Sequence, residues 1–171
     1  MAWVSLDAQT RPQPDVIGDV QHLPLKAEAF DSVLCSEVAE YVGRPDKALA
    51  EMARVLKPGG RLLLAAPFLH RADAPGDLWR FTEAGLRRLL AEGGFDVVEV
   101  RAQGAALGVC ANILRYAVTS IASRSLRRLA AGLAYLPLRL LAAADGPAAR
   151  AVPALTSFST GHAALASKAM E

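Results

Sequence analysis

The chain has 171 residues, of which 53% are hydrophobic, and a formal net charge of +2. This length suits one domain with its own core and is short for two, so residues 1–171 are interpreted as a single domain. The small net charge, without a stripe of basic and aromatic side chains, argues against nucleic acid as a partner.

Short β-rich runs alternate with helical patterns through residues 1–103. This alternation is typical of βα units and predicts an α/β fold with a mostly parallel sheet. The expected strands cover residues 3–6, 15–19, 31–35, 61–66 and 95–101, and a last strand covers residues 162–167.

Two helices are expected between these strands. Residues 45–56 place Leu49, Met52 and Leu56 three and four apart, so one helical face packs on the sheet. The following Lys-Pro-Gly-Gly at 57–60 ends this helix, because proline cannot continue it and glycine permits a sharp turn. Thr82 is expected to cap a second helix, which ends at the glycine pair at 93–94.

Residues 104–153 form a helical insertion rich in alanine, leucine and arginine. The spacing predicts two helices over 104–144, with breaks at 123–125 and at Pro137. Gly146, Pro147 and Pro153 are expected to form a loop that leads to the last strand and tail at 154–171. The insertion could pack on the domain edge, cover an acceptor, form a homodimer surface or make a peripheral, amphipathic membrane contact.

The two cysteines, Cys35 and Cys110, belong to no CxxC or Cys/His cluster, so no metal site is expected. The N-terminal residues lack the pattern of a secretion signal, which favours a cytoplasmic setting, with peripheral membrane contact left open. Arginines interrupt each apolar stretch that could span a membrane, so no spanning helix is expected.

Residues 18–67, "GDVQHLPLKAEAFDSVLCSEVAEYVGRPDKALAEMARVLKPGGRLLLAAP", closely resemble the methyltransferase type 11 group of class I S-adenosylmethionine-dependent methyltransferases. The later segments "PGDLWRFTEAGLRRLLAEGGF" and "STGHAALASK" are also similar to this group. The resemblance implies a Rossmann-like sheet whose last strand is antiparallel, and S-adenosyl-L-methionine as the cofactor. Such a domain normally begins with a strand and a glycine-rich loop, which have no counterpart before Asp7.

The resemblance also implies cofactor-binding residues at the carboxyl ends of strands. Asp7 matches the acid that accepts hydrogen bonds from the ribose hydroxyls, and Asp19 matches the acid that accepts from the adenine amino group, with the Val20 amide facing the ring. Both aspartates could instead be ordinary turn residues. Cys35, Ser36 and Glu37 end the strand that approaches the methionine part of the cofactor. Their side chains could have no specific role, and Cys35 is more typical of a small buried hydrophobe.

A loop after the next strand holds the candidate acceptor residues. His70 is a tentative catalytic base, because a neutral imidazole can take a proton near pH 7. Asp77, Trp79 and Arg80 could form a substrate lid, or an Arg–Asp pair could simply hold the loop down. Glu40-Tyr41 replaces the "EH" pair common in this group and leaves acid–base assignments there open.

The leading hypothesis is methyl transfer to a small-molecule or lipid-linked acceptor. The missing strand allows two explanations: the true start lies upstream of Met1, or the chain is a catalytically inactive binding or assembly module. Upstream sequence is the favoured expectation, since the remaining cofactor-side residues look intact. Dinucleotide-dependent oxidoreduction is not favoured, because the sequence has no GxGxxG motif.

Overall fold

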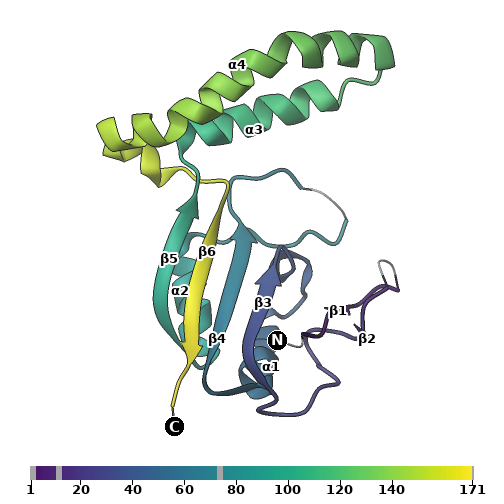
Figure 1. Cartoon of the computed structure of the whole chain (residues 1–171), viewed down its shortest axis with the longest axis vertical. Coiled ribbons are helices and arrows are strands. Elements are labelled where there is room, and N and C mark those ends of the chain that lie inside the picture. Colours follow the sequence, from purple (N-terminus) through teal and green to yellow (C-terminus); the bar gives the residue numbers. More distant parts are fainter. Residues whose placement is uncertain (1–2, 11–12, 73–74, 171) are drawn as a thin grey trace.

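A four-stranded sheet lies at the centre of the computed structural model, which describes residues 3–10, 13–72 and 75–170. Its strands are β3 (Phe30–Ser36), β4 (Leu56–Pro67), β5 (Phe95–Gln103) and β6 (Gly161–Lys168), in the spatial order β3-β4-β6-β5 (Figure 1). β3 and β4 are parallel, whereas β6 runs antiparallel to both β4 and β5. The predicted mostly parallel sheet with an antiparallel last strand is therefore confirmed.

The first two strands form a separate, small parallel sheet beside β3 (Figure 1). β1 (Leu6–Asp7) pairs with β2 (Val16–Ile17), so both are shorter than the sequence predicts. The Asp15 carboxylate also links the two segments, since it accepts hydrogen bonds from the amide and the hydroxyl of Ser5 at 2.8 and 2.7 Å. Among the described residues, β3 is an edge strand with no partner on its outer side.

Helices α1 (Pro45–Val55) and α2 (Glu83–Glu92) pack together behind the sheet in Figure 1. The Thr82 hydroxyl accepts a hydrogen bond from the Gly85 amide at 3.1 Å, which confirms the predicted N-cap of α2. α1 ends close to the predicted place, but the expected turn at 57–60 is already part of β4. Gly59, with φ of +69°, supplies left-handed backbone to an irregular stretch of that strand, where the pairing with β3 shifts between Leu56 and Arg61.

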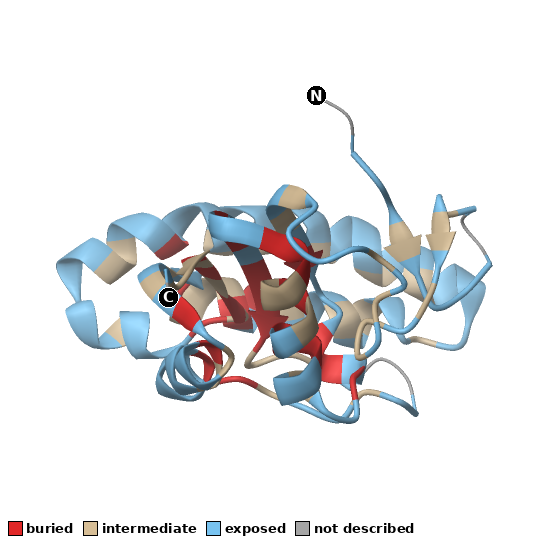
Figure 2. Cartoon of the chain, turned by 90° about the horizontal axis from the view of Figure 1, so that it is seen from below, coloured by how far each residue is buried: buried red, intermediate tan, exposed pale blue. Residues whose placement is uncertain are grey.

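The hydrophobic core lies between this pair of helices and one face of the sheet, where Figure 2 shows the buried residues gathered. Leu56, Leu62 and Leu64 of β4 pack there against Leu86 and Leu90 of α2, and all five are fully buried. The opposite face carries exposed apolar side chains, Leu34, Leu63 and Val98. Only one face of the sheet is thus covered by described helices.

Helices α3 (Ala106–Thr119) and α4 (Arg124–Ala151) form an antiparallel hairpin beyond the ends of the strands (Figure 1). The two-helix prediction is confirmed, whereas the break lies at 120–123, slightly before the predicted 123–125, because Ser123 already caps α4. The predicted break at Pro137 and the loop at Gly146-Pro147 are wrong, because α4 continues through both prolines. Pro137 is exposed, so the carbonyl that its ring displaces can be hydrated. Short 3-10 turns cover Ala39–Tyr41 (η1) and Pro153–Ser157 (η2).

α4 also corrects the expectation that no helix could span a membrane. Its 28 residues are long and apolar enough to do so by length and composition, the only such helix among the described residues. Only 6% of the most apolar 18-residue stretch of α4 is buried inside the protein. Its apolar character is therefore not explained by a place in the core.

Candidate functional site

Asp7 closes β1, and its backbone carbonyl accepts a hydrogen bond from the Gly18 amide at 3.0 Å. This bond holds the end of β1 beside the end of β2. The Asp7 carboxylate accepts from the Gln9 amide at 2.8 Å and is otherwise exposed. Because a carboxylate offers about four lone-pair positions, this turn contact leaves Asp7 able to accept further hydrogen bonds.

Asp19 follows β2 in the same way. Its carboxylate accepts from the Gln21 amide at 2.8 Å and from the Gln21 side chain. These hydrogen bonds lower the pKa of Asp19 below its ordinary value, so it is charged at neutral pH. Val20 packs partly against the core, which fixes the backbone next to this carboxylate. The two acids thus stand at the carboxyl ends of two adjacent parallel strands.

β3 ends in a sharp backbone turn. Glu37 has φ of +53°, an unusual conformation for a residue with a side chain, and its amide donates to the Ala65 carbonyl at 3.0 Å. Ser36 and Glu37 are exposed, whereas Cys35 is buried. Burial raises the pKa of the Cys35 thiol to about 12, so the thiolate needed for nucleophilic chemistry is scarce. Cys35 behaves here as a small apolar residue.

Glu40, which the sequence marks only as part of the pair that replaces "EH", is buried close to the end of β3, and the sequence does not reveal this burial. It is 3% exposed, and its Oε2 atom has no hydrogen-bond partner in the described structure. Burial, followed by the nearby charges of Glu37 and Asp77, raises the pKa of Glu40. A buried carboxyl oxygen without a partner is costly, which makes this atom a candidate to receive a hydrogen bond from a ligand.

His70 lies in the loop after β4, and its Nε2 atom is 3.1 Å from the Tyr116 hydroxyl of α3. The two rings also meet edge to face, with centroids 5.4 Å apart. His70 therefore connects this loop to the helical hairpin, a contact between residues 46 positions apart. Its imidazole could act as a base only if the Tyr116 contact opened or relayed the proton.

The proposed lid residues hold the same loop in place. Arg80 forms an ion pair with Asp77, with Nη2 and Oδ2 2.7 Å apart, and its guanidinium also donates to the carbonyls of His70 and Arg71. The Trp79 indole donates to the Val42 carbonyl at 2.8 Å. The structure therefore brings His70, Asp77 and Arg80 together through contacts within the protein.

A second group that the sequence did not reveal is a buried serine–histidine pair. The Ser159 hydroxyl lies 3.3 Å from His162 Nε2, and His162 Nδ1 lies 3.1 Å from the Phe81 carbonyl. A carbonyl can only accept, so Nδ1 carries the proton and Nε2 accepts from Ser159. The contact with Phe81 joins β6 to the start of α2. Ser159 is 2% exposed, so the pair does not face a substrate.

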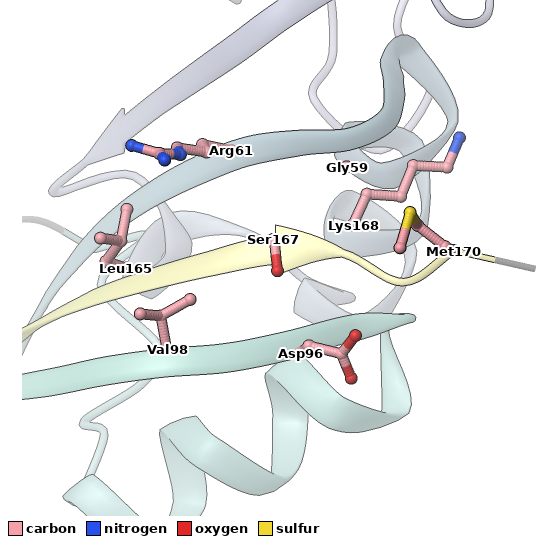
Figure 3. Close-up of a pocket in the computed structure, with 8 residues that line it drawn as sticks. All are labelled: Gly59, Arg61, Asp96, Val98, Leu165, Ser167, Lys168 and Met170. Atoms are coloured by element: carbon pink, nitrogen blue, oxygen red, sulfur yellow. The ribbon is translucent and has the colours of Figure 1, made fainter.

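A hollow on the described surface lies elsewhere. It measures about 480 Å³ and is formed on the exposed sheet face by Arg61, Asp96, Leu165 and Lys168, among others (Figure 3). These residues lie toward the amino ends of the parallel strands, and none of them is a predicted site residue. In open α/β sheets the ligand crevice lies at the carboxyl ends, so this hollow is not the candidate site.

Comparisons with known proteins agree with the sequence-based resemblance. Residues 2–64 match the methyltransferase domain family. A demethylmenaquinone methyltransferase of Renibacterium salmoninarum is 41% identical over 76 residues, which cover 44% of this chain and 32% of that enzyme. The chain spans about a third of the length of the curated relatives it matches.

Solved structures share the fold. The [4+2]-cyclase SpnF superposes with a TM-score of 0.53 at 23% identity, covering 92% of this chain and 56% of that one. A complex from Haloferax volcanii that contains the Trm112 methyltransferase activator gives a TM-score of 0.54 at 18% identity, covering 96% of this chain and 70% of that one. These likenesses establish the Rossmann-like fold. They do not establish the reaction, since a shared fold serves several chemistries.

Proposed function

We propose that this chain, whose residues 2–64 match the methyltransferase domain family, serves S-adenosyl-L-methionine-dependent methyl transfer to a small-molecule or lipid-linked acceptor. The observation that carries the proposal is the pair of exposed carboxylates, Asp7 and Asp19, at the carboxyl ends of β1 and β2. The relatives named demethylmenaquinone methyltransferase support the lipid-linked alternative.

The described residues fit the adenosine half of the cofactor. Asp7 would accept from the two ribose hydroxyls, and the negatively charged Asp19 would accept from the adenine amino group beside the Val20 amide. The partnerless Oε2 atom of Glu40 would gain a donor when a ligand occupies the site. S-adenosyl-L-methionine itself supplies an activated methyl group, so the protein mainly orients the acceptor and excludes water.

The test is calorimetric titration of the chain with S-adenosylhomocysteine. Binding is expected, and Asp7→Asn and Asp19→Asn should each weaken it on the order of tenfold, because a charge-assisted hydrogen bond is lost. Asp96→Asn is the matched control, since this exposed aspartate lies in the hollow at the other end of the sheet. No binding by the chain, or equal weakening by all three variants, would overturn the proposal.

A second candidate function is that of a catalytically inactive binding or assembly module. The outer edge of β3 favours it, because a strand edge with no partner in the described structure is a template for another chain. Sedimentation velocity separates the two candidates when combined with the titration. Self-association without cofactor binding would favour the module, whereas a monomer that binds the cofactor would exclude it.

A further inference from the structure

α4 carries a row of exposed leucines that no described part of the chain covers. Their spacing of three and four residues aligns them along one side of the helix. Each is between 54% and 72% exposed. We call this row the leucine stripe; it consists of Leu126, Leu129, Leu133, Leu136 and Leu140.

The leucine stripe is distinct from the side of α4 that packs in the hairpin. The less exposed residues of α4 include Ala130, Ala134 and Leu141, and they lie on the side toward α3. With about 100° per residue, the centre of the leucine stripe lies about 120° around the helix from this packed side. The leucines are therefore available to a surface outside the protein.

A third side of α4 is basic. Arg128 and Arg139 lie about 120° from both other sides and are exposed. We call this side the arginine face; it comprises Arg124, Arg128, Arg139 and Arg150. A helix that lies flat in a bilayer interface requires such an apolar stripe with long cations beside it, because arginine can reach the headgroups while its stem stays in apolar surroundings.

The charge of the chain is unevenly divided. Residues 105–151 hold six arginines and one aspartate, a net charge of +5, although the whole chain is only +2. The rest of the chain is therefore at −3. The single acid, Asp145, is buried, so no acidic side chain is exposed on the hairpin to repel an anionic surface.

From these observations we propose that the α3–α4 hairpin adsorbs on anionic lipid bilayers, with the leucine stripe inserted in the interface and the arginine face at the phosphates. The proposal concerns a surface and does not depend on methyl transfer. If the acceptor is lipid-linked, the same contact would bring the candidate site close to it.

The geometry favours a helix in the membrane plane over one that spans it. Spanning would place Arg139 in hydrocarbon, at a cost of several kcal/mol on most scales. It would also remove Asp145 from the start of α3, where its Oδ2 atom accepts from the Ala105 amide at 2.6 Å. Adsorption along the leucine stripe keeps this bond and the packing of the hairpin.

The test is cosedimentation of the full chain with phosphatidylcholine vesicles, with or without an equal part of phosphatidylglycerol. Binding is expected only with phosphatidylglycerol, and it should fall as salt is raised. Leu133→Gln with Leu136→Gln should weaken binding on the order of tenfold, and Arg128→Gln with Arg139→Gln by a similar factor. These side chains are exposed, so the variants should fold.

Matched controls test whether vesicle binding depends on the hairpin or on any exposed leucine or arginine of the protein. Leu34→Gln with Leu63→Gln alters exposed leucines on the sheet, and Arg87→Gln with Arg88→Gln removes two charges from α2. Both controls should bind vesicles as the parent does. Absence of vesicle binding, or equal losses in the control variants, would overturn the proposal.

Two further outcomes would also overturn it. Sedimentation velocity that shows a dimer, lost when Leu133 and Leu136 are replaced, would assign the leucine stripe to a second copy of the chain. Retention in the membrane pellet after washing with alkaline carbonate would indicate a spanning helix. Release by high salt or carbonate is the result expected of in-plane adsorption.

Discussion

Replacing Arg80 by methionine tests whether the loop after β4 is held by its buried ion pair. Asp77 is 2% exposed and Arg80 27% exposed in this pair. The Arg80 guanidinium also donates to the Trp79 carbonyl and the Arg71 carbonyl, both at 2.7 Å. Methionine retains much of the apolar stem and removes all of these donors, so the variant isolates their contribution.

The expected loss of stability follows from burial. Removing one partner of a fully buried ion pair costs about 3 to 5 kcal/mol, since the other charge stays buried. Arg80 is partly exposed, so water can replace some of its contacts and about 2 to 3 kcal/mol is the better expectation. With a urea m-value of about 2 kcal/mol per molar, the unfolding midpoint should fall by about 1 M or more.

The control is Arg88→Met. Arg88 pairs with Glu92 on the surface of α2, with both side chains more than half exposed. Such a pair contributes little, so no measurable change of midpoint is expected. Equal midpoints for Arg80→Met and Arg88→Met in urea unfolding followed by circular dichroism would refute the idea that the Arg80–Asp77 pair holds the loop.

Three other predictions concern single side chains. The free energy of unfolding of Glu40→Gln should exceed that of the parent increasingly as the pH rises above about 4.5, because burial raises the pKa of Glu40 and makes its ionisation in the folded protein costly. Below that pH the two free energies should converge. Urea unfolding at several pH values measures the difference, and a parent that becomes the more stable protein as the pH rises would contradict the prediction. Iodoacetamide near pH 8 should label the exposed Cys110 and spare Cys35 until urea is added; labelling of native Cys35, detected by mass spectrometry, would contradict its burial and its pKa of about 12. Thr82→Ala should cost about 1 kcal/mol of unfolding free energy and Thr82→Ser much less, because serine keeps the N-cap hydroxyl that binds the Gly85 amide.

Local signals in the sequence predicted most of the fold. Thr82 caps α2, and α1 ends just before the Lys-Pro-Gly-Gly run at 57–60; both signals act through backbone chemistry within a few residues. Pro137 shows where local rules fail. Its effect on a helix depends on whether tertiary contacts hold both halves in line, and α3 packs along α4 in this structure. The sequence pattern of α4 alone does not contain that contact.

The candidate site was predictable only in part, for the same physical reason. Asp7 ends β1 and Asp19 follows β2, so their positions at a sheet edge follow from the strand pattern. The partnerless Glu40 and the contact of His70 with Tyr116 depend on residues far apart in the chain. A raised pKa or a tertiary hydrogen bond leaves no periodic signal in a single sequence.

The contacts of the predicted site residues also separate two kinds of role. Arg80 and Trp79 direct donors at carbonyl or carboxylate groups of the protein itself, so a ligand that used them would have to displace those bonds. Asp7 and Asp19 are exposed, and within the described part of the chain their carboxylates accept hydrogen bonds from residues two positions away, which leaves lone pairs directed to solvent. A small molecule that bound at the two aspartates would therefore break no tertiary contact of these carboxylates in the described structure. Binding at the loop requires rearrangement, and this difference makes the aspartates the better first target for mutation.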